Sequence, residues 1–182
     1  MSEKKPNLAW IDLEMTGLED DHVIIEIASL VTNSNLVELA EGPVIAIHRA
    51  PEEIANINPW SKEQHTKSGL LERVSQSNIS LEKAEQLTLD FFELWLDKGT
   101  SPLCGNSIST DRKFIRNEMP LLDEFLHYRL IDVSTIKELT TRWYPEKTIP
   151  IKKGEHLALA DIRESVEELR WYRENVFLPS SE

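Results

Sequence analysis

The sequence predicts an α/β fold in which helices flank a mixed sheet, and two observations support this prediction. Strand patterns joined by short turns occupy residues 1–50, and helical patterns then alternate with short strand patterns along the rest of the chain. Such an order favours a sheet with helices on its faces. The 182 residues are sufficient for a buried core, and no repeat, low-complexity tract or linker divides them. We therefore expect a single domain over residues 1–182.

Strands are expected where side chains alternate in polarity or where β-branched residues gather. The first strand pattern places Trp10, Asp12 and Glu14 on one side and apolar residues on the other. A turn signal follows at once, at Thr16-Gly17, and short turns between the first three patterns predict an antiparallel meander. The expected strands cover residues 8–15, 23–31, 43–48, 103–104 and 128–133.

Helices are expected where a cap precedes a 3.6-residue apolar periodicity. Ser61 and Gln64 have capping-box spacing, and Ser80 is the expected cap of a long helix that ends at Gly99. Pro120 is expected to end the helix before it. The inner face of the long helix is expected to hold Ala84, Leu87, Phe91, Leu94 and Trp95. The later helices are expected over residues 111–118, 134–143 and 157–176.

The net charge narrows the classes of function. It is −12, which argues against binding of long nucleic acids, because that affinity comes mostly from Lys and Arg side chains that neutralise many phosphates. A short substrate remains compatible with this charge. A site that holds divalent metals binds one or two phosphates whatever the charge of the remaining surface.

The composition also predicts a cytoplasmic protein without a membrane partner. Cys104 is the single cysteine, so no internal disulfide is possible and a reducing compartment is expected. Residues 1–7 are polar and lack the apolar stretch of a signal peptide. No run approaches the ~18 apolar residues that a membrane span needs.

Asp12 and Glu14 are the first candidate site residues, because positions two apart on a strand share a face. Two such carboxylates repel by about 4 kcal/mol at 4 Å with an effective dielectric of ~20. A cation between them removes that repulsion. Taken alone, the pair is better explained as an ordinary strand face in contact with water.

Two later segments carry further candidates. Gly105-Asn106-Ser107 follows a buried strand and leads to Asp111 at a helix start, which is a way to direct a carboxylate into a cleft. Asp111 or Thr110 as a simple helix cap explains this segment equally well. His156 and Asp161 are five apart, so a shared helix face is not expected, since neighbours on one face lie three and four apart. They converge only if His156 lies on a loop before the helix.

Together these residues resemble the DEDDh 3′→5′ exonucleases, whose motifs stand near the start, in the middle and near the end of the chain. Within that family the similarity is greatest to the oligoribonuclease branch, and it covers nearly the whole chain. The segments that carry it are residues 9–18, 58–65, 103–111, 128–134 and 156–161. The resemblance implies an RNase H-like fold. It also implies hydrolysis of short oligoribonucleotides, especially dinucleotides, from the 3′ end to 5′-mononucleotides.

The resemblance further implies two divalent cations, Mg²⁺ or Mn²⁺, held by the acidic residues of the motifs. These residues are Asp12, Glu14, Asp111 and Asp161. Ligands that are all oxygen fit hard cations, and two such ions stabilise the attacking and leaving oxygens. His156 is implied as the general base for the attacking water. The ordinary histidine pKa of about 6.5 suits proton abstraction near neutral pH.

Substrate contacts are implied by the same resemblance. Leu18 and Trp60 would pack against the two bases, although core packing is an alternative for Trp60. Stacking of this kind is indifferent to sequence. Contacts to the phosphates would come from Ser107, Arg129 and Ser134 at the 5′ phosphate, and from His65 and Tyr128 near the scissile phosphate.

Two residues near the predicted 5′-phosphate site leave alternatives open. Ser134 is also a candidate helix N-cap, and Asp132 is a possible rival metal ligand for which a structural role is favoured. In the family Tyr128 reaches across a homodimer interface, so a homodimer is expected.

Other functions compete with short-RNA hydrolysis. The nearest is a DEDDh exonuclease that trims longer RNA or DNA ends, but it needs an extended basic path that a chain of charge −12 does not offer. A non-catalytic nucleic-acid-binding module has no need of four acidic residues and a histidine in these positions. A phosphodiesterase for a substrate other than nucleic acid is a third possibility.

Overall fold

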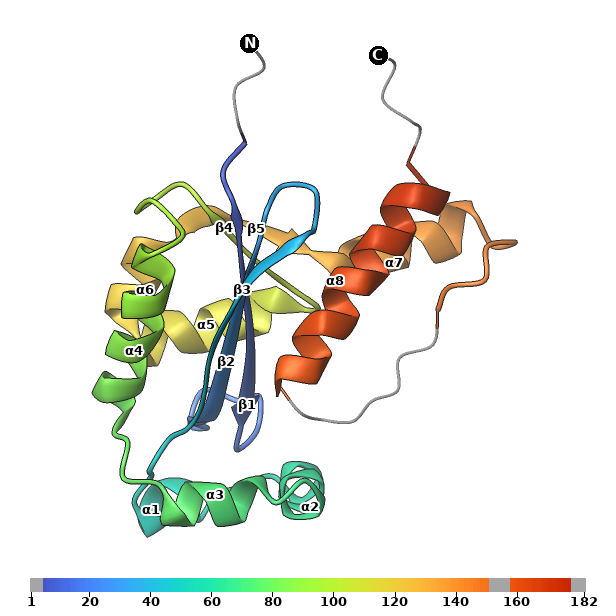
Figure 1. Ribbon diagram of the computed structural model, residues 1–182. Helices are drawn as coiled ribbons and strands as arrows, with labels where there is room; N and C mark the ends of the chain where they lie inside the picture. Colours follow the sequence, from blue (N-terminus) through green and yellow to red (C-terminus); the bar gives the residue numbers. More distant parts are fainter. Residues whose placement is uncertain (1–4, 151–157, 178–182) are drawn as a thin grey trace.

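The structure is a computed structural model that describes residues 5–150 and 158–177. Within these residues, one mixed five-stranded sheet lies at the centre of the molecule (Figure 1). The order across the sheet is β3-β2-β1-β4-β5. β1, β2 and β3 form the expected antiparallel meander, and β4 and β5 continue the sheet parallel to β1. The strands are Leu8–Met15 (β1), Ile24–Thr32 (β2), Glu38–Ala46 (β3), Pro102–Gly105 (β4) and His127–Asp132 (β5).

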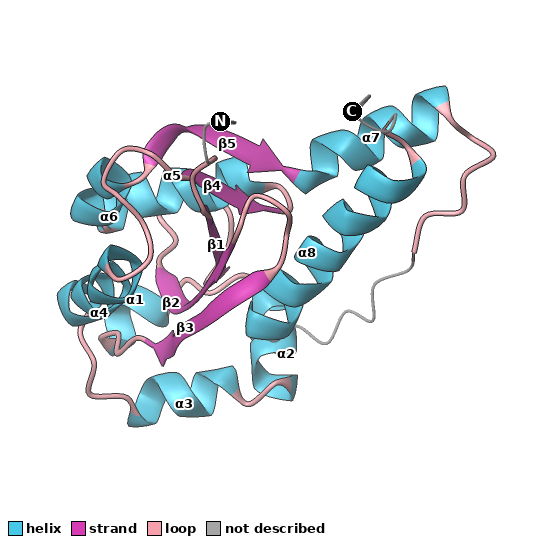
Figure 2. Cartoon of the chain, turned by 45° about the horizontal axis from the view of Figure 1, so that its top comes forward, coloured by secondary structure: helices cyan, strands magenta, loops and turns pink. Residues whose placement is uncertain are grey.

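Helices cover both faces of this sheet, which confirms the predicted fold class (Figure 2). One face packs against Leu81–Glu93 (α4), Ile108–Glu118 (α5) and Pro120–Phe125 (α6). The other packs against Val133–Trp143 (α7) and Ala158–Asn175 (α8). Beyond the end of the sheet where β1 stops lie Pro51–Ile54 (α1), Pro59–Lys67 (α2) and Leu70–Gln76 (α3) (Figure 1).

The alternation of β1 assigns its side chains to the two faces as expected. Ile11 and Leu13 enter the core under α4, α5 and α6, whereas Trp10 is buried under α8. The indole Nε1 of Trp10 donates a hydrogen bond to Thr32 Oγ1 at 3.0 Å, so this polar atom is satisfied inside the core. Because side chains repeat with a period of two, Asp12 and Glu14 leave β1 on the face that α8 covers.

The long helix α4 differs from the sequence prediction at its end. Ser80 caps it as expected, with its side chain accepting from the amide of Lys83, but the helix stops at Glu93 instead of reaching Gly99. Leu94 and Trp95 therefore follow the helix, and Leu94 is 78% exposed. Their predicted inner position was wrong. The buried apolar residues of α4 are Ala84, Leu89 and Phe92.

Other boundaries also depend on capping. The cap of α2 is Asn58, whose side chain accepts from the amide of Trp60, and the predicted capping box at Ser61 was wrong. Pro120 follows the end of α5 as expected and is also the first residue of α6, where its missing amide costs nothing.

In the described part of the chain no helix combines the length and apolar character that a bilayer crossing requires.

Candidate active site

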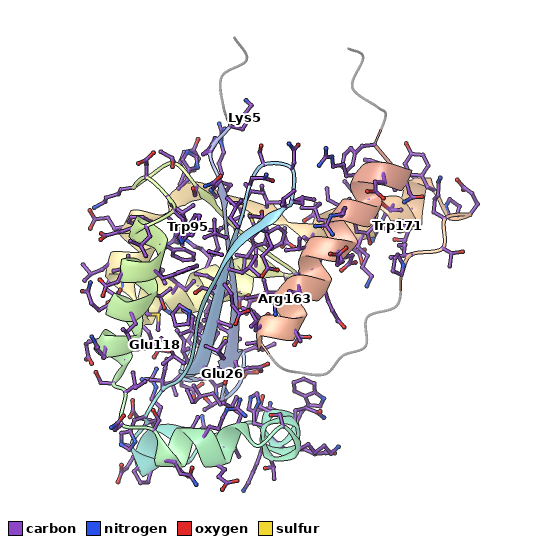
Figure 3. All side chains as sticks on the ribbon, in the orientation of Figure 1. Lys5, Glu26, Trp95, Glu118, Arg163 and Trp171 are labelled. Carbon is purple, nitrogen blue, oxygen red and sulfur yellow. The ribbon has the colours of Figure 1, made fainter. Side chains whose placement is uncertain are left out.

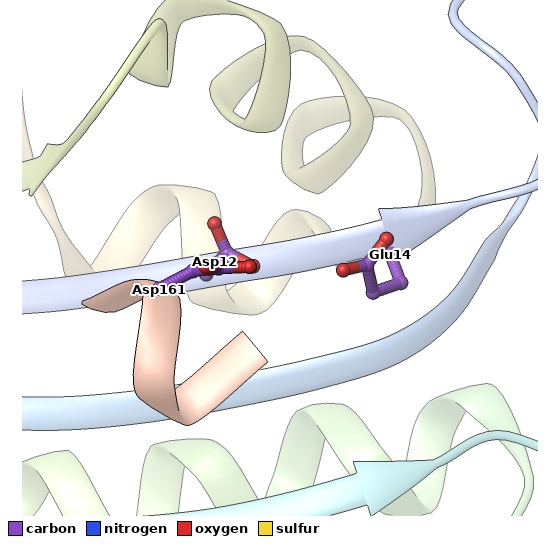
Figure 4. A group of neighbouring side chains, drawn as sticks. All are labelled: Asp12, Glu14 and Asp161. Atoms are coloured by element: carbon purple, nitrogen blue, oxygen red, sulfur yellow. The ribbon is translucent and has the colours of Figure 1, made fainter. Parts of the chain in front are cut away.

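Three carboxylates converge where β1 meets the first turn of α8 (Figure 4). Asp12 and Glu14 come from β1, and Asp161 comes from α8. One oxygen from each lies within 4.8 Å of the others, and all three residues are half-buried. We call these three residues the acidic cluster. The strand period and the docking of α8 on β1 and β2 together produce it.

Asp111 lies beside the acidic cluster on α5. β4 pairs with β1 at Ala9 and Trp10, and it ends at Gly105, so it does not extend along the later residues of β1. The backbone amide of Leu13 instead donates to Asp111 Oδ1 at 3.0 Å. Asp111 is buried within α5 and is not its cap, so the alternative cap assignment was wrong. The carboxylate is held by the strand that carries Asp12 and Glu14.

The turn before α5 contains a close backbone approach at Gly105 and a left-handed backbone conformation at Ser107. A Cβ atom on Gly105 would lie 2.7 Å from the Ile108 side chain and 3.2 Å from the carbonyl oxygen of Ile11, so the close approach of β4 to β1 favours glycine. Ser107 has a φ of +52°, in the left-handed region. This turn directs the first turn of α5 toward β1.

The carboxylates of the site destabilise one another's charged forms. Burial, followed by the negative charge of Glu26, raises the pKa of Glu14 to about 8. Asp161 and Asp111 add to this rise, and Arg73 opposes it. Burial also raises the pKa of Asp111 to about 7, with Asp132 adding to the rise and backbone hydrogen bonds opposing it. These groups gain stability from a nearby cation.

The donor set fits a divalent cation. Its atoms are carboxylate oxygens, which hard cations such as Mg²⁺ and Mn²⁺ prefer, and they approach one another closely enough to share an ion. Burial, and after it the neighbouring carboxylates, raise the pKa of Glu14 and disfavour its charged form, which a bound cation would favour. The arrangement and the electrostatics therefore both favour metal binding.

His65 from α2 faces the same region. It is buried, its Nε2 lies 2.9 Å from the carbonyl oxygen of Met15, and its Nδ1 lies 3.7 Å from Glu14 Oε2. Trp60 stands at the start of the same helix and is 60% exposed, so the alternative of core packing was wrong. Leu18, in the loop after β1, is 63% exposed. Both residues predicted to contact bases are thus exposed at the surface.

The loop that carries Leu18 is fixed at its base. The Thr16 hydroxyl oxygen accepts from the amide of Val23, and it lies 3.0 Å from Nδ1 of the buried His22. A Cβ atom on Gly17 would come within 2.4 Å of the His22 ring, so the loop packs tightly on this histidine. His22 was not predicted as a site residue, because a lone histidine before a strand carries no distinctive signal.

Asp132 organises the residues predicted to bind the 5′ phosphate. Its Oδ1 accepts from the amide of Ser107 at 2.9 Å, the amide of Ser134 at 3.0 Å and the hydroxyl of Ser134 at 2.5 Å. Asp132 is therefore the N-cap of α7, and the alternative that Ser134 caps this helix was wrong. The Ser107 and Ser134 hydroxyl oxygens lie 3.4 Å apart. The structure thus brings these two serines together.

Tyr128 and Arg129 lie on β5, the strand that leads to Ser134. Both are exposed, and the guanidinium carbon of Arg129 lies 5.4 Å from the centre of the Tyr128 ring. His156 lies outside the described residues, in the segment before α8. Its predicted position relative to Asp161 stays a prediction.

Glu26 and Arg73 are neighbours of the site that were not predicted from the sequence. Glu26 is 2% exposed and stands opposite Glu14 in the register of β1 and β2. Its signal was visible as a single acidic residue inside a run of β-branched and apolar residues.

Comparisons with known proteins agree with this geometry. A family model described as an exonuclease, RNase T, matches residues 9–169. An oligoribonuclease from Vibrio parahaemolyticus is 55% identical over 97% of this chain and 99% of its own length. Another, from Pseudomonas savastanoi pv. phaseolicola, is 54% identical with the same coverage of both chains.

Solved structures share the fold. The zinc-bound complex of E. coli ExoI with single-stranded DNA matches with a TM-score of 0.74 at 14% identity, over 94% of this chain and 41% of that chain. Exonuclease I from Methylocaldum szegediense matches with a TM-score of 0.65 at 15% identity and the same coverage. The chain spans about two fifths of the length of these proteins, and the likeness establishes an RNase H-like exonuclease fold. By its family model and its nearly full-length relatives, the chain belongs to the RNase T family of exonucleases and, within it, to the oligoribonuclease branch.

Proposed function

We propose that this chain is a metal-dependent 3′→5′ exoribonuclease that hydrolyses short oligoribonucleotides, especially dinucleotides, to 5′-mononucleotides. The observation that carries the proposal is the acidic cluster of Asp12, Glu14 and Asp161, within 4.8 Å and beside the buried Asp111. Membership of an exonuclease family makes the phosphodiester bond the target of hydrolysis. The name of the relatives supplies the substrate class, short RNA.

The metal ligands in this proposal are Asp12, Glu14, Asp111 and Asp161. They would hold two divalent cations, Mg²⁺ or Mn²⁺, which supply charge stabilisation to the attacking and leaving oxygens of the displacement. Asp111 contributes a carboxylate whose orientation is fixed by the Leu13 amide. Glu14 contributes a carboxylate with a raised pKa, so a nearby positive charge would favour its ionised form.

His156 is the proposed general base. It precedes Asp161 by five residues in the sequence, and the proposal requires that it approach the acidic cluster from the segment before α8. A base in this position takes the proton of the attacking water at neutral pH, where an ordinary histidine is largely neutral.

Substrate length is set, in this proposal, by the distance between the acidic cluster and a 5′-phosphate site. Leu18 and Trp60 pack against the two bases, and His65 contacts the substrate near the scissile phosphate. Ser107, Ser134 and Arg129 receive the 5′ phosphate, since an Arg fork and hydroxyl donors suit phosphate oxygens. The contact between Ser107 and Ser134 supports this assignment.

The organisation of the active protein completes the proposal. Residues 1–182 act as one domain, in the cytoplasm, as a homodimer in which Tyr128 reaches the site of the partner subunit. The exposure of Tyr128, 74%, supports its availability to a second chain.

The test is hydrolysis of 5′-phosphorylated RNAs of two to seven nucleotides, measured one length at a time. Fastest turnover of the dinucleotide supports the proposal. Equal or rising rates with length would favour an exonuclease that trims longer ends, and RNA binding without hydrolysis would favour a binding module. Hydrolysis of a generic phosphodiester with no preference for RNA would indicate a different substrate class.

A further inference from the structure

Glu26 is a buried acidic residue in a strand whose other side chains are also buried. Every residue of β2 is buried, and Glu26 itself is 2% exposed. It stands directly opposite Glu14 in the antiparallel register of β1 and β2. Directly opposite residues of such a pair leave the same face of the sheet, so both carboxylates lie on the side that carries the acidic cluster. Figure 3 places Glu26 at the end of the sheet near α3.

The cationic partner of Glu26 comes from α3. The Nη2 atom of Arg73 lies 2.7 Å from Glu26 Oε1, and its Nη1 donates to the carbonyl oxygen of Ser68 at 3.1 Å. The Arg73 side chain is 42% exposed, so the guanidinium reaches from the surface to the buried carboxylate. The ion pair also ties α3 to the sheet, next to the helix that carries Trp60 and His65.

Packing alone does not account for this pair. Burial of a carboxylate lowers the free energy of unfolding even when the carboxylate is paired, because the charge loses its hydration. An uncharged residue of similar size would avoid this loss. Glu26 also stands directly opposite Glu14, so its negative charge lies beside a proposed metal ligand. Arg73 brings a positive charge to the same place through its 2.7 Å ion pair with Glu26. Both charges therefore act on a proposed metal ligand.

We propose that Glu26 and Arg73 are a positioning pair that sets the metal affinity of the site. Glu26 adds negative charge beside the ligands and strengthens cation binding, and Arg73 moderates that charge. The inference rests on the metal site of the proposed function, and neither residue is a ligand in it. If the pair acts through its charges, neutralising Glu26 and neutralising Arg73 change the metal affinity in opposite directions. If the pair is only a structural contact, both substitutions change the metal affinity in the same direction.

The experiment measures Mn²⁺ binding without RNA, by calorimetry and by the electron paramagnetic resonance of free Mn²⁺. Glu26→Gln keeps the size of the side chain and an acceptor for Arg73, and it is expected to weaken binding about tenfold, as outer-shell residues commonly do. Arg73→Gln is expected to tighten binding by roughly two- to fivefold, a smaller change because an exposed charge is screened. Arg73→Lys, which keeps the charge, is expected to bind nearly as the wild type does.

Matched control variants test whether the loss of a charge elsewhere in the protein also changes the Mn²⁺ affinity. Glu85→Gln removes a buried carboxylate that accepts from the amides of Leu121 and Leu122, on the other face of the sheet. Arg142→Gln removes a guanidinium paired with Glu138 on α7. Neither is expected to change Mn²⁺ affinity. The rise in Tm on adding Mn²⁺ should shrink in Glu26→Gln and grow in Arg73→Gln.

The two proposals fail in different ways. If Asp12→Asn binds Mn²⁺ as tightly as the wild type, the proposed metal site is wrong. If Asp12→Asn loses binding while Glu26→Gln and Arg73→Gln leave it unchanged or shift it in the same direction, the site stands and the positioning role is overturned. Arg73→Gln alone decides the matter if Glu26→Gln does not fold, because Arg73 lies partly at the surface.

Discussion

Asp111 Oδ1 accepts a hydrogen bond from the backbone amide of Leu13 at 3.0 Å, which joins α5 to the edge of β1 between two proposed metal ligands. Asp111 thus has a structural contact and a proposed catalytic role at once, and its two oxygens allow both. Substitutions at this position separate the two roles.

Asp111→Ala and Asp111→Asn are expected to differ in stability but not in activity. Alanine leaves the Leu13 amide without its acceptor, which costs about 1–3 kcal/mol, whereas asparagine keeps an acceptor oxygen. Both remove a ligand charge, so both should lose nearly all hydrolysis. Urea unfolding in chelator and dinucleotide turnover measure the two effects. An active Asp111→Asn would contradict the metal role.

The metal-free protein is expected to lose stability as pH rises from about 5 to 8. The pKa values of Glu14, about 8, and Asp111, about 7, lie above the ordinary values of 4.5 and 3.8. The folded state therefore binds more protons than the unfolded chain in this window, and deprotonation removes stability, at up to ~1.4 kcal/mol per pKa unit before solvent screening. Saturating Mg²⁺ should flatten the slope. Thermal unfolding in chelator at a series of pH values measures the dependence of stability on pH. If this dependence were unchanged in Glu14→Gln, Glu14 would not be one of the groups responsible for it.

His156→Ala is expected to keep Mn²⁺ and dinucleotide binding while kcat falls by ~10²–10⁴, the usual contribution of a general base. Wild-type activity should decline as pH falls through the histidine titration. Steady-state kinetics across pH provide the measurement. A raised KM with unchanged kcat would make His156 a binding group.

Arg129→Ala is expected to flatten the preference for short RNA. Loss of a charge-assisted contact costs roughly 1.5–3 kcal/mol, or about one to two decades in affinity, and only a substrate with its 5′ phosphate in the site has that contact to lose. Dinucleotides should weaken far more than heptamers. Binding of two- to seven-mers to the wild type and the variant, with Ca²⁺ to block turnover, is the measurement. An unchanged length profile would overturn the phosphate assignment.

Trp60→Ala is expected to weaken RNA binding without unfolding the protein. Stacking on an aromatic ring contributes ~1–3 kcal/mol per base, and a side chain that is 60% exposed adds little to the core. Trp60→Phe should retain most of the affinity. Leu94→Ala, at another exposed apolar residue far along the chain, is the control and should leave binding unchanged. Equal losses in both variants would point to a general effect of surface change.

The sequence pattern predicted the part of the fold that depends on local alternation. The period of two along β1 was enough to place Trp10, Asp12 and Glu14 on one face, and turn signals were enough for the meander. The end of α4 was not predictable, because Leu94 and Trp95 continue its apolar pattern, and only the tertiary packing shows that the chain leaves the helix before them.

The site was predictable where a motif is continuous in sequence and less so where residues meet through the sheet. Glu26 faces Glu14 through the register of two strands, which the residues alone do not specify. Asp132 was assigned a structural role, but its three hydrogen bonds to Ser107 and Ser134 depend on the meeting of the β4 and β5 ends.

The acidic cluster joins segments that lie far apart in the sequence, since Asp12 and Glu14 lie on β1 and Asp161 lies on α8. A ribosome must therefore synthesise the chain through α8 before the three carboxylates can meet. A nascent chain that has folded only its sheet still lacks one of them. Under the proposed metal mechanism, nuclease activity beside the messenger under translation is thus deferred until α8 has emerged and docked.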